Sequence, residues 1–517
     1  MVFRYLKVLR IAVSLFFFLT FLFVFLDFGQ LFPDAWIKRL IWLQFVPSII
    51  AFTGKAALIT AGFILVVLMT LLYGRIYCSF LCPLGVFQDI IIRLAHYKRK
   101  IRFRYSGPYN LIRYVILTLV ALVTLSGSLL LLNLLDPWTL FGKISESLFR
   151  PLVIGANNGM AWLLERAGNY TLAPHPFVAA NLPLAGFALF MTALFMYLTV
   201  KHGRLYCNSI CPVGAFLGLL SKYSFFRISL DRTSCTRCGA CSMNCKAGCI
   251  DVRDQSVDFT RCVGCLNCLS VCPEDGVTFK PAWRAGSGSG QLPDAERRRV
   301  VRKLGNGIML LGGLQTTTAL AQVIADKKPV NRKCHATPPG SGSIEHFTRH
   351  CTACQLCVSR CPTGVLQPSF GETGITGIFQ PFMDYQAHFC NYECIVCTQV
   401  CPTGAINLLT VDDKKLTQVG ISKFIKENCI VYRDEKDCGA CSEHCPTKAV
   451  NMVPYKTGLK IPEVNIDICI GCGACEYACP TTPKSIFVDG NEIHQTAKKP
   501  EVKRDGNKFT PPDEFPF

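Results

Sequence analysis

Residues 262–273 read CVGCLNCLSVCP, in which four cysteines are spaced C-x2-C-x2-C-x3-C and a proline follows the last of them. Residues 235–245 carry the same spacing, with Lys246 where the proline would stand. Thiolates are soft ligands, and groups of them at short intervals bind soft metals or iron–sulfur clusters. The segment 231–280 is short and lacks long periodic runs, so we expect the metal centres themselves to form its core.

Four more quartets follow nearer the C-terminus, and a proline follows each of them. Two keep the same spacing, and two lengthen the first interval to three and eight residues. The six quartets together use 24 of the 30 cysteines. The four later quartets are Cys351, Cys354, Cys357, Cys361; Cys390, Cys394, Cys397, Cys401; Cys429, Cys438, Cys441, Cys445; and Cys469, Cys472, Cys475, Cys479.

The repeated cysteine spacing argues against the two main alternatives to iron–sulfur clusters, which are zinc sites and a disulfide scaffold. Zinc sites pair C-x2-C motifs a dozen or more residues apart, without the third cysteine and the proline. A disulfide scaffold would not repeat a single spacing six times. The pattern is typical of bacterial ferredoxins, in which the fourth cysteine of one run serves the other cluster. We therefore predict six 4Fe-4S clusters.

The exchange of fourth cysteines predicts the ligand sets of the first two runs. One set is Cys235, Cys238, Cys241 and Cys272; its partner is Cys262, Cys265, Cys268 and Cys245. For the four later quartets the spacing leaves the exchange open. Cys249 lies near the end of the first run and is expected to be a spare thiol, and Cys334 is also left over.

Two similar motifs occur in the N-terminal half. Residues 74–87 read GRIYCSFLCPLGVF, and residues 203–216 read GRLYCNSICPVGAF. Each follows an apolar stretch, so the repeat predicts two similar halves related by an axis along the membrane normal. Positions i and i+4 share one helix face, so each motif presents two thiols together. If the halves meet, the four motif cysteines hold a further cluster or a metal; otherwise they are separate or structural thiols. The motif cysteines are Cys78, Cys82, Cys207 and Cys211.

The chain is half hydrophobic and only 17% charged, which suits a protein that is part membrane and part soluble. A bilayer requires about 20 apolar residues for each crossing. Five stretches are expected to cross: 11–26, 56–73, 111–135, 182–200 and 304–324. The mixed stretches 35–52 and 148–164 predict interfacial or re-entrant helices, with additional spans as the alternative.

The net charge of +19 reflects basic residues that flank the apolar stretches, most densely in YKRKIRFR at residues 97–104. Short loops rich in Lys and Arg stay in the cytoplasm. The distribution therefore predicts a bacterial inner-membrane protein with a cytoplasmic N-terminus, a cytoplasmic segment 231–280 and a periplasmic C-terminal part. We expect no nucleic acid partner.

The stretch ERRRVVR at residues 296–302 precedes the fifth apolar stretch and resembles a twin-arginine export signal, with Arg297 and Arg298 as the pair. Free thiols exported unfolded into an oxidising compartment would form disulfides. A domain that receives its clusters in the cytoplasm must therefore cross folded. An ordinary span with a basic flank is the alternative.

The predicted fold class is mixed: an α-helical membrane domain with about five transmembrane helices and a twofold repeat, and α+β ferredoxin-like 4Fe-4S domains. The expected order is a four-span membrane domain (1–230), a cytoplasmic two-cluster domain (231–280), a linker with the twin-arginine-like motif (281–303), a fifth helix or signal anchor (304–325) and a periplasmic four-cluster domain (326–517).

These motifs match a known family. Residues 1–280 resemble the NapH-type membrane ferredoxins, quinol dehydrogenase components of periplasmic nitrate reductase systems, in their four spans, two cysteine motifs and two-cluster segment. Residues from about 296 onward resemble the NapG-type periplasmic ferredoxins in the twin arginine, the Pro338-Pro339-Gly340 stretch and the four quartets. The chain is similar to a fusion of the two.

The resemblance implies a quinol dehydrogenase module of a larger respiratory complex. Electrons would pass from menaquinol or ubiquinol in the membrane lipid to a periplasmic reductase or a multihaem cytochrome. Asp136, Glu165 and His175 are candidates for proton handling at a quinol site on the outer side, with solvated loop residues as the alternative.

Two other functions remain open. The protein would be a transmembrane conduit between cytoplasmic and periplasmic redox pools if the motif cysteines or a quinone bridged the bilayer core of about 30 Å. A redox sensor or an assembly factor is the third hypothesis, although neither needs 24 cluster ligands.

Overall fold

In a computed structural model of the chain, the described residues are 2–54, 61–98, 103, 105–175, 181–282, 330–386, 388–456 and 458–499. The predicted fifth span, the linker and the twin-arginine-like motif lie outside these residues. The chain forms two compact units. Unit 1 combines Met1–Asp326 with Glu345–Phe382 and Val396–Asn407; unit 2 combines Lys327–Ile344, Met383–Ile395 and Leu408–Phe517.

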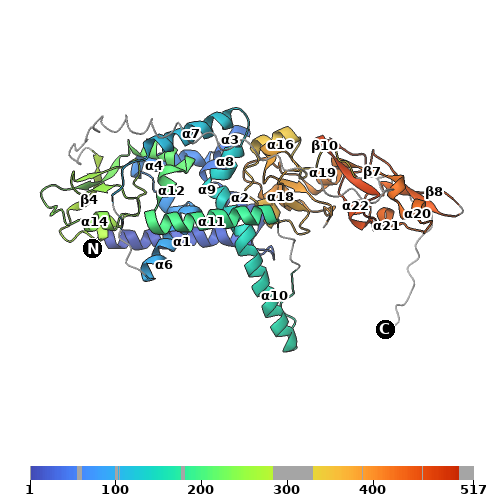
Figure 1. Cartoon of the computed structure of the whole chain (residues 1–517), viewed down its shortest axis with the longest axis horizontal. Coiled ribbons are helices and arrows are strands. Elements are labelled where there is room, and N and C mark those ends of the chain that lie inside the picture. Colours follow the sequence, from blue (N-terminus) through green and yellow to red (C-terminus); the bar gives the residue numbers. More distant parts are fainter. Residues whose placement is uncertain are drawn as a thin grey trace, which may run out of the picture. The chain divides into compact units, whose positions relative to one another are not determined.

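Unit 1 is built on helices (Figure 1). They are α1 (Val2–Leu26), α2 (Asp34–Ile41), α3 (Phe45–Gly54), α4 (Gly62–Tyr73), α5 (Tyr77–Phe80), α6 (Pro83–Lys98), α7 (Asn110–Leu125), α8 (Leu130–Leu135), α9 (Pro137–Ile144), the π-helical turn η2 (Ser145–Phe149), α10 (Arg150–Arg166), α11 (Leu182–His202), α12 (Leu205–Ser209) and α13 (Pro212–Ser221). Among the described residues, Tyr5–Leu26 and Leu182–His202 are long and apolar enough to cross a membrane, and the other apolar helices are shorter.

One expected helix is wrong. The stretch 111–135 was predicted to be continuous, but α7 ends at Leu125 and α8 begins at Leu130. Gly127, with φ of 90°, lies in the left-handed region between them, where glycine is favoured and a helix ends. The mixed stretches are helical, as expected: α2 and α3 cover the first, and η2 and α10 cover the second. Figure 1 shows α10 extending away from the other helices of its unit.

The first two cysteine runs lie in a small α+β segment of unit 1. Its strands form two antiparallel pairs, and its helices are single turns that begin within the cysteine runs. The elements are β1 (Phe226–Leu230) with β4 (Val277–Pro281), β2 (Ile250–Asp251) with β3 (Ser256–Val257), α14 (Ala240–Met243) and η3 (Cys268–Ser270).

Part of the later cysteine region also belongs to unit 1. It contains α16 (Ile344–His350), α17 (Leu356–Ser359), β5 (Leu366–Pro368), η6 (Ile375–Gly377), β6 (Pro381–Met383) and α18 (Val396–Val400). Unit 2 begins at Lys327, close to the expected boundary, but the structure groups Glu345–Phe382 and Val396–Asn407 with the N-terminal helices.

Unit 2 is a second α+β segment. Its strands pair antiparallel, with Ile486 opposite Phe424 and Val450 opposite Val464. Its core consists largely of cysteines packed with Val450 and Ile486, as expected for a small domain stabilised by metal centres. The elements are α19 (Val411–Leu416), β7 (Thr417–Phe424), η7 (Lys426–Asn428), α20 (Ile430–Arg433), α21 (Ala440–Glu443), β8 (Val450–Pro454), β9 (Lys460–Val464), α22 (Ala474–Ala478) and β10 (Ile486–Thr496).

Candidate iron–sulfur sites

Two cavities in the first α+β segment are lined by cysteines drawn from both runs, and Cys249 also lines the second cavity. The distal inner set is Cys235, Cys238, Cys241 and Cys272. The proximal inner set is Cys245, Cys262, Cys265 and Cys268. These are the two sets that the sequence predicts if each run gives its fourth cysteine to the other cluster, and the structure brings each set together. That these sets bind clusters stays a prediction.

The chemistry of both sets fits a metal cluster. Burial raises the pKa of Cys268 well above its usual value, and the neighbouring Cys265 and Cys262 raise it further. Burial likewise raises the pKa of Cys241, with Cys235 and Cys272 adding to the effect. Cys268 and Cys241 therefore resist ionisation as free thiols, and cationic iron would supply the compensating charge that lets their thiolates form.

The structure of unit 2 favours one pairing of the last two cysteine quartets, which the spacing left open. Burial raises the pKa of Cys441 to about 12, and Cys438, Cys479 and Cys429 raise it further. Burial also raises the pKa of Cys475 well above its usual value, and Cys472, Cys469 and Cys445 raise it further. The structure thus brings together sets in which the last two quartets exchange their fourth cysteines, and that these sets bind clusters stays a prediction. The resulting sets are Cys429, Cys438, Cys441, Cys479 and Cys469, Cys472, Cys475, Cys445.

The first outer set lies in unit 1 and follows the same rule. Cys357 lies in electrostatic range of Cys351, Cys354 and Cys401, so the fourth cysteine again comes from the next quartet. In the remaining positions, Cys361 and Cys397 belong to unit 1, and Cys390 and Cys394 belong to unit 2. The spacing left the exchange of these cysteines open.

Cys249 belongs to neither inner set, but it is buried against one of them. It is 2% exposed, and its Sγ lies 3.5 Å from the Sγ of Cys245. A hydrogen bond also joins it to Cys262, and both partners belong to the proximal inner set. Hydrogen bonds therefore join Cys249 to two sulfurs of the proximal inner set. Cys334, the other leftover thiol, donates to the carbonyl oxygen of Gly490 at 2.6 Å.

The motif cysteines converge in unit 1. Each is at most 5% exposed, and Cys211 lies in electrostatic range of Cys207, Cys78 and Cys82. The two motifs also bind one another reciprocally. Arg75 Nη2 donates to the carbonyl oxygen of Cys207 at 2.9 Å, and Arg204 Nη1 donates to that of Cys78 at 2.6 Å.

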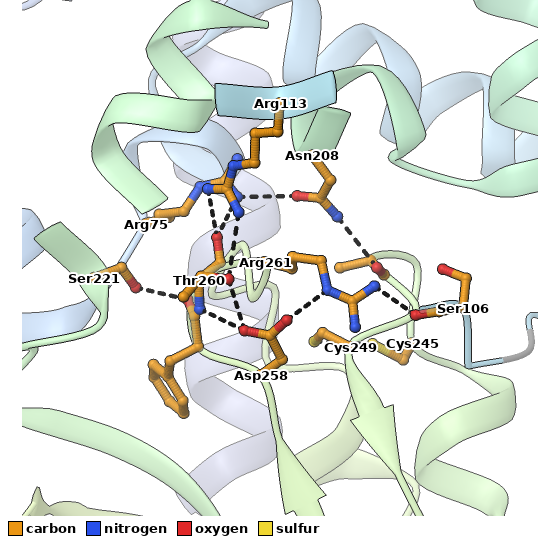
Figure 2. Close-up of polar contacts among 12 residues, drawn as sticks. Arg75, Ser106, Arg113, Asn208, Ser221, Cys245, Cys249, Asp258, Thr260 and Arg261 are labelled. Atoms are coloured by element: carbon orange, nitrogen blue, oxygen red, sulfur yellow. Dashed lines mark hydrogen bonds and ion pairs between the residues drawn. The ribbon is translucent and has the colours of Figure 1, made fainter. Parts of the chain in front are cut away.

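The same arginines connect the motifs to the proximal inner set. Arg75 Nη1 and Arg113 Nη2 both donate to the carbonyl oxygen of Thr260, at 3.0 and 2.8 Å, two residues before the ligand Cys262 (Figure 2). Thr260 is held in turn by Asp258, whose carboxylate also pairs with Arg261 at 2.7 Å. The loop that carries Cys262 is therefore clamped onto the first motif.

The second motif holds the other loop of the same set. The backbone N–H of Arg204 donates to the carbonyl oxygen of Lys246 at 2.8 Å, and Asn208 Nδ2 donates to that of Ala247 at 3.2 Å. A Cβ at Gly203 would lie 2.2 Å from the Lys246 oxygen, so this contact requires glycine. Lys246 Nζ also pairs with Asp89 at 3.2 Å. The lysine that replaces the usual proline thus docks the cluster loop on the helices.

Helices α8 and α9 separate the motifs from the first outer set. On one side, Tyr206, next to Cys207, donates its hydroxyl to the carbonyl oxygen of Leu135 at 2.7 Å. On the other side, a Cβ at Gly142 would lie 2.1 Å from the carbonyl oxygen of Cys354. One layer of buried helix, about 10 Å thick, therefore lies between the two groups of cysteines.

Two buried groups anchor the first outer set to the helices. Arg360, fully buried, pairs with Asp27 at 2.6 Å and with Asp34 at 2.5 Å, at the end of α1 and the start of α2. Lys143, also fully buried, donates to the carbonyl oxygen of Asn133 and lies over the ring of Phe379.

The three quinol-site candidates do not converge. Asp136 is buried and caps α9, accepting from the N–H and hydroxyl of Thr139 at 2.8 and 2.9 Å. This contact gives it a structural role as a helix cap. Glu165 is exposed in the last turn of α10. The His175 ring contacts Phe28 edge-on, with centroids 4.5 Å apart.

Sequence reasoning missed the charged residues around the sites, namely Asp89, Arg113, Lys143 and Arg360. Only Arg75 and Arg204 carried a signal, because each follows the glycine of a repeated motif. Their partners come from elements far away in the sequence, and no spacing rule connects them.

Two family models match parts of the chain. A family model described as a 4Fe-4S binding domain matches residues 41–104 and 182–232, and one described as a 4Fe-4S dicluster domain matches residues 436–482. No solved structure matches the chain.

Several curated proteins are similar to parts of the chain. Ferredoxin-type protein NapH of Escherichia coli (strain K12) is 28% identical over 47% of this chain and 72% of its own length. Methylamine utilization ferredoxin-type protein MauM of Methylophilus methylotrophus is 30% identical over 39% of this chain and 90% of its own length. Ferredoxin-type protein NapF of Escherichia coli (strain K12) is 30% identical over 28% of this chain and 80% of its own length. The resemblance to NapH-type ferredoxins joined to further ferredoxin sequence is thereby confirmed.

Proposed function

Since the chain belongs to the ferredoxin-type iron–sulfur proteins, we propose that it carries electrons across a bacterial inner membrane through its 4Fe-4S clusters. The inner sets exchange electrons with the cytoplasm, and the outer sets pass them to a periplasmic reductase or cytochrome. Other subunits of a respiratory complex complete the system.

The observation that carries this proposal is the arrangement of α1. Near its start, Lys7 Nζ donates to Ser270 Oγ at 3.0 Å, between the inner ligands Cys268 and Cys272. At its end, Asp27 pairs with Arg360, next to Cys361. About twenty helical residues separate these contacts, which at 1.5 Å per residue span about 30 Å, the thickness of a bilayer core.

Cysteine groups follow one another along this span. The proximal inner set docks on the motif cysteines through Arg75 and Arg204, and the α8–α9 layer separates the motif cysteines from the first outer set. A gap of bilayer thickness is thereby divided into shorter steps. This order favours a transmembrane conduit rather than two separate electron carriers that do not exchange electrons with one another.

Quinol oxidation is the second candidate, as the resemblance to NapH-type ferredoxins implies. It is favoured by the first outer set, whose Cys354 packs directly on α9, because a Cβ at Gly142 would lie 2.1 Å from the Cys354 carbonyl oxygen. A menaquinol or ubiquinol oxidised in that part would have an acceptor set within the same unit. If quinol is the donor, electrons enter at the first outer set and do not pass through the motif cysteines.

Proteoliposomes distinguish the two functions. Full-length protein is oriented with unit 2 outside, and a membrane-impermeant reductant is trapped in the lumen. The conduit predicts reduction of an external impermeant acceptor, and this reduction should stop in a Cys265→Ala/Cys268→Ala variant, which lacks two proximal inner ligands. The Cys334→Ser variant is the control.

Quinol added to the same bilayer provides the second arm. If quinol oxidation is the function, quinol should reduce the outer clusters equally in the wild type and in Cys265→Ala/Cys268→Ala. Absence of electron transfer from both sources would overturn the proposed function.

A further inference from the structure

We propose that buried cations make the proximal inner set the electron sink of the inner pair, that is, the set with the higher reduction potential. An electron delivered from the cytoplasm to the distal inner set then moves to the proximal inner set, which docks on the motif cysteines. The inference rests on the proposed function and deepens it, because it gives electron flow within the inner pair a direction. Two groups of charged residues carry it.

The first group surrounds Thr260, in the loop that leads into the proximal inner set (Figure 2). Arg75 and Arg113 both donate to its carbonyl oxygen, and Arg261 follows it in the chain. Arg75 is fully buried and Arg113 is 1% exposed. Neither forms an ion pair within the described part of the chain, and the carboxylate of Asp258 pairs with Arg261 at 2.7 Å. Three cations therefore share one carboxylate.

The second group surrounds Asp89 on α6. Its carboxylate pairs with Arg204 at 2.8 Å, with Arg10 at 3.1 Å and with Lys246 at 3.2 Å. Arg204 and Arg10 are buried, and Lys246 directly follows Cys245 of the proximal inner set. Three cations again share one carboxylate, so positive charge is in excess in this group too.

Both groups lie in electrostatic range of sulfurs in the proximal inner set. Arg75 acts on Cys262, and Lys246 and Arg10 act on Cys265. The side chains that line the cavity of this set are apolar residues and cysteines, so little solvent screens the cations. Buried positive charge without a counter-charge is strongly unfavourable, and an anionic cluster in this cavity would supply the missing negative charge.

The distal inner set has a different setting. The charged residues that line its cavity are Arg237 and Glu274, which have opposite signs and are exposed to solvent. Water and salt screen exposed charges. Cys238 of this set is the exposed cysteine of the chain, all others being buried or half-buried. The distal inner set is therefore accessible to a soluble electron carrier and receives little electrostatic help in holding an electron.

These settings order the two reduction potentials. An added electron makes a cluster more negative, so nearby buried cations stabilise the reduced state and raise the potential. Burial in an apolar cavity acts in the opposite direction, because it disfavours the added charge. The excess of cations over carboxylates in both groups outweighs burial, and the proximal inner set has the higher potential.

The step transfers a single electron. A soluble one-electron donor in the cytoplasm is oxidised and reduces a ferric iron held by the distal inner set. The ferrous iron formed there is then oxidised again, and a ferric iron held by the proximal inner set is reduced. No bond forms or breaks, and no proton is taken up.

Redox titration of the full chain, followed by electron paramagnetic resonance, tests the order. The signal lost in Cys235→Ala/Cys238→Ala belongs to the distal inner set, and the signal lost in Cys265→Ala/Cys268→Ala belongs to the proximal one. As the potential of the wild type is lowered, the proximal signal should appear first, and should still do so at about 1 M salt because buried charges are screened little. Equal potentials or the reverse order would overturn the inference.

Arg75→Gln and Lys246→Met test the cause. Each removes one cation and should lower the ratio of reduced to oxidised proximal set about tenfold at a given potential, which corresponds to about 59 mV for one electron. The distal signal should not move. Arg75→Lys and Lys246→Arg keep the charge and should restore most of the shift, whereas loss of structure alone would not be restored. Arg253→Gln removes an exposed charge from the same α+β segment and should leave both potentials unchanged.

Two results in the variants contradict the proposal. One is an unchanged proximal potential in both charge-removing variants, and the other is an equal shift in the variants that keep the charge. Lys246 is half-buried, so Lys246→Met and the order in the wild type still decide the matter if Arg75→Gln does not fold.

These results also separate the inference from the proposed function. Equal potentials of the two inner sets with intact transfer across liposomes reject the electron sink alone. The expected order of potentials without transfer across liposomes rejects the proposed function and leaves the electron sink in place.

Discussion

The guanidinium of Arg75 donates a 2.9 Å hydrogen bond to the carbonyl oxygen of Cys207. Arg204 makes the equivalent bond to Cys78 at 2.6 Å. Each motif therefore supplies the residue that fixes the backbone of the other motif, and neither cysteine pair is positioned by its own sequence alone. This reciprocity makes the packing at the motifs intolerant of small additions.

Gly85→Ala and Gly214→Ala test that packing. A Cβ at Gly85 would lie 2.2 Å from the carbonyl oxygen of Cys78, and one at Gly214 would lie 2.1 Å from that of Cys207. We expect each substitution to destabilise the fold by about 1–3 kcal/mol, the usual cost of overpacking. Thermal unfolding in detergent measures the change. Gly186→Ala is the matched control, because its Cβ meets nothing within 4 Å. Equal melting temperatures for Gly85→Ala and the control would contradict the expectation.

Arg360→Met should detach the first outer set from the helices. The change leaves the buried carboxylate of Asp27 without its partner, and breaking a buried pair costs about 3–5 kcal/mol. Limited proteolysis and chemical unfolding should both report the loss. Arg349→Ala removes an exposed pair with Glu345, with side chains 58% and 72% exposed, and should change stability by less than about 1 kcal/mol. An Arg360→Met protein as stable as the control would refute the anchoring role.

Cys249→Ala should lower the reduction potential of one inner cluster. Hydrogen bonds to ligand sulfur stabilise the reduced, more negative state, and Cys249 contacts Cys245 and Cys262. Loss of about 1 kcal/mol of that preference corresponds to roughly 40 mV for one electron. Cys249→Ser keeps a donor and should shift the potential less. Redox titration of the inner signals provides the measurement, and an unchanged potential in Cys249→Ala would exclude tuning by this thiol.

Unit 2 should lose stability in mild acid through His494. Burial lowers the pKa of this imidazole to about 4 in the folded state, against an ordinary value of about 6.5. The unfolded chain therefore binds the proton first. Stability is complete above about pH 6.5 and falls as the pH drops toward 4, by up to roughly 3 kcal/mol.

His494→Gln isolates this contribution. Glutamine retains a partner for Thr337, whose hydroxyl lies 2.9 Å from His494 Nε2. The free energy of unfolding of the variant should depend less on pH between 4 and 6.5 than that of the wild type. Parallel pH dependences in the two proteins would contradict the assignment.

How much could be predicted from the sequence differs between the sites. The inner sets follow from spacing, because two adjacent runs offer a single exchange of fourth cysteines. The exchange between Cys445 and Cys479 did not follow, because four quartets allow several pairings and folding selects one. The contacts of Cys249 with two sulfurs did not follow either, because its burial depends on how the chain turns after Cys245.

The sequence by itself determined the cluster chemistry and the two helical motifs, because cysteine spacing and apolar runs are local properties of the chain. Only the tertiary structure decided that the motif cysteines converge and that Arg75 and Arg113 clamp Thr260. It also decided that Arg360 joins the first outer set to the helices. The physical reason is that a buried charge must find its partners in space, and those partners lie up to several hundred residues away along the chain.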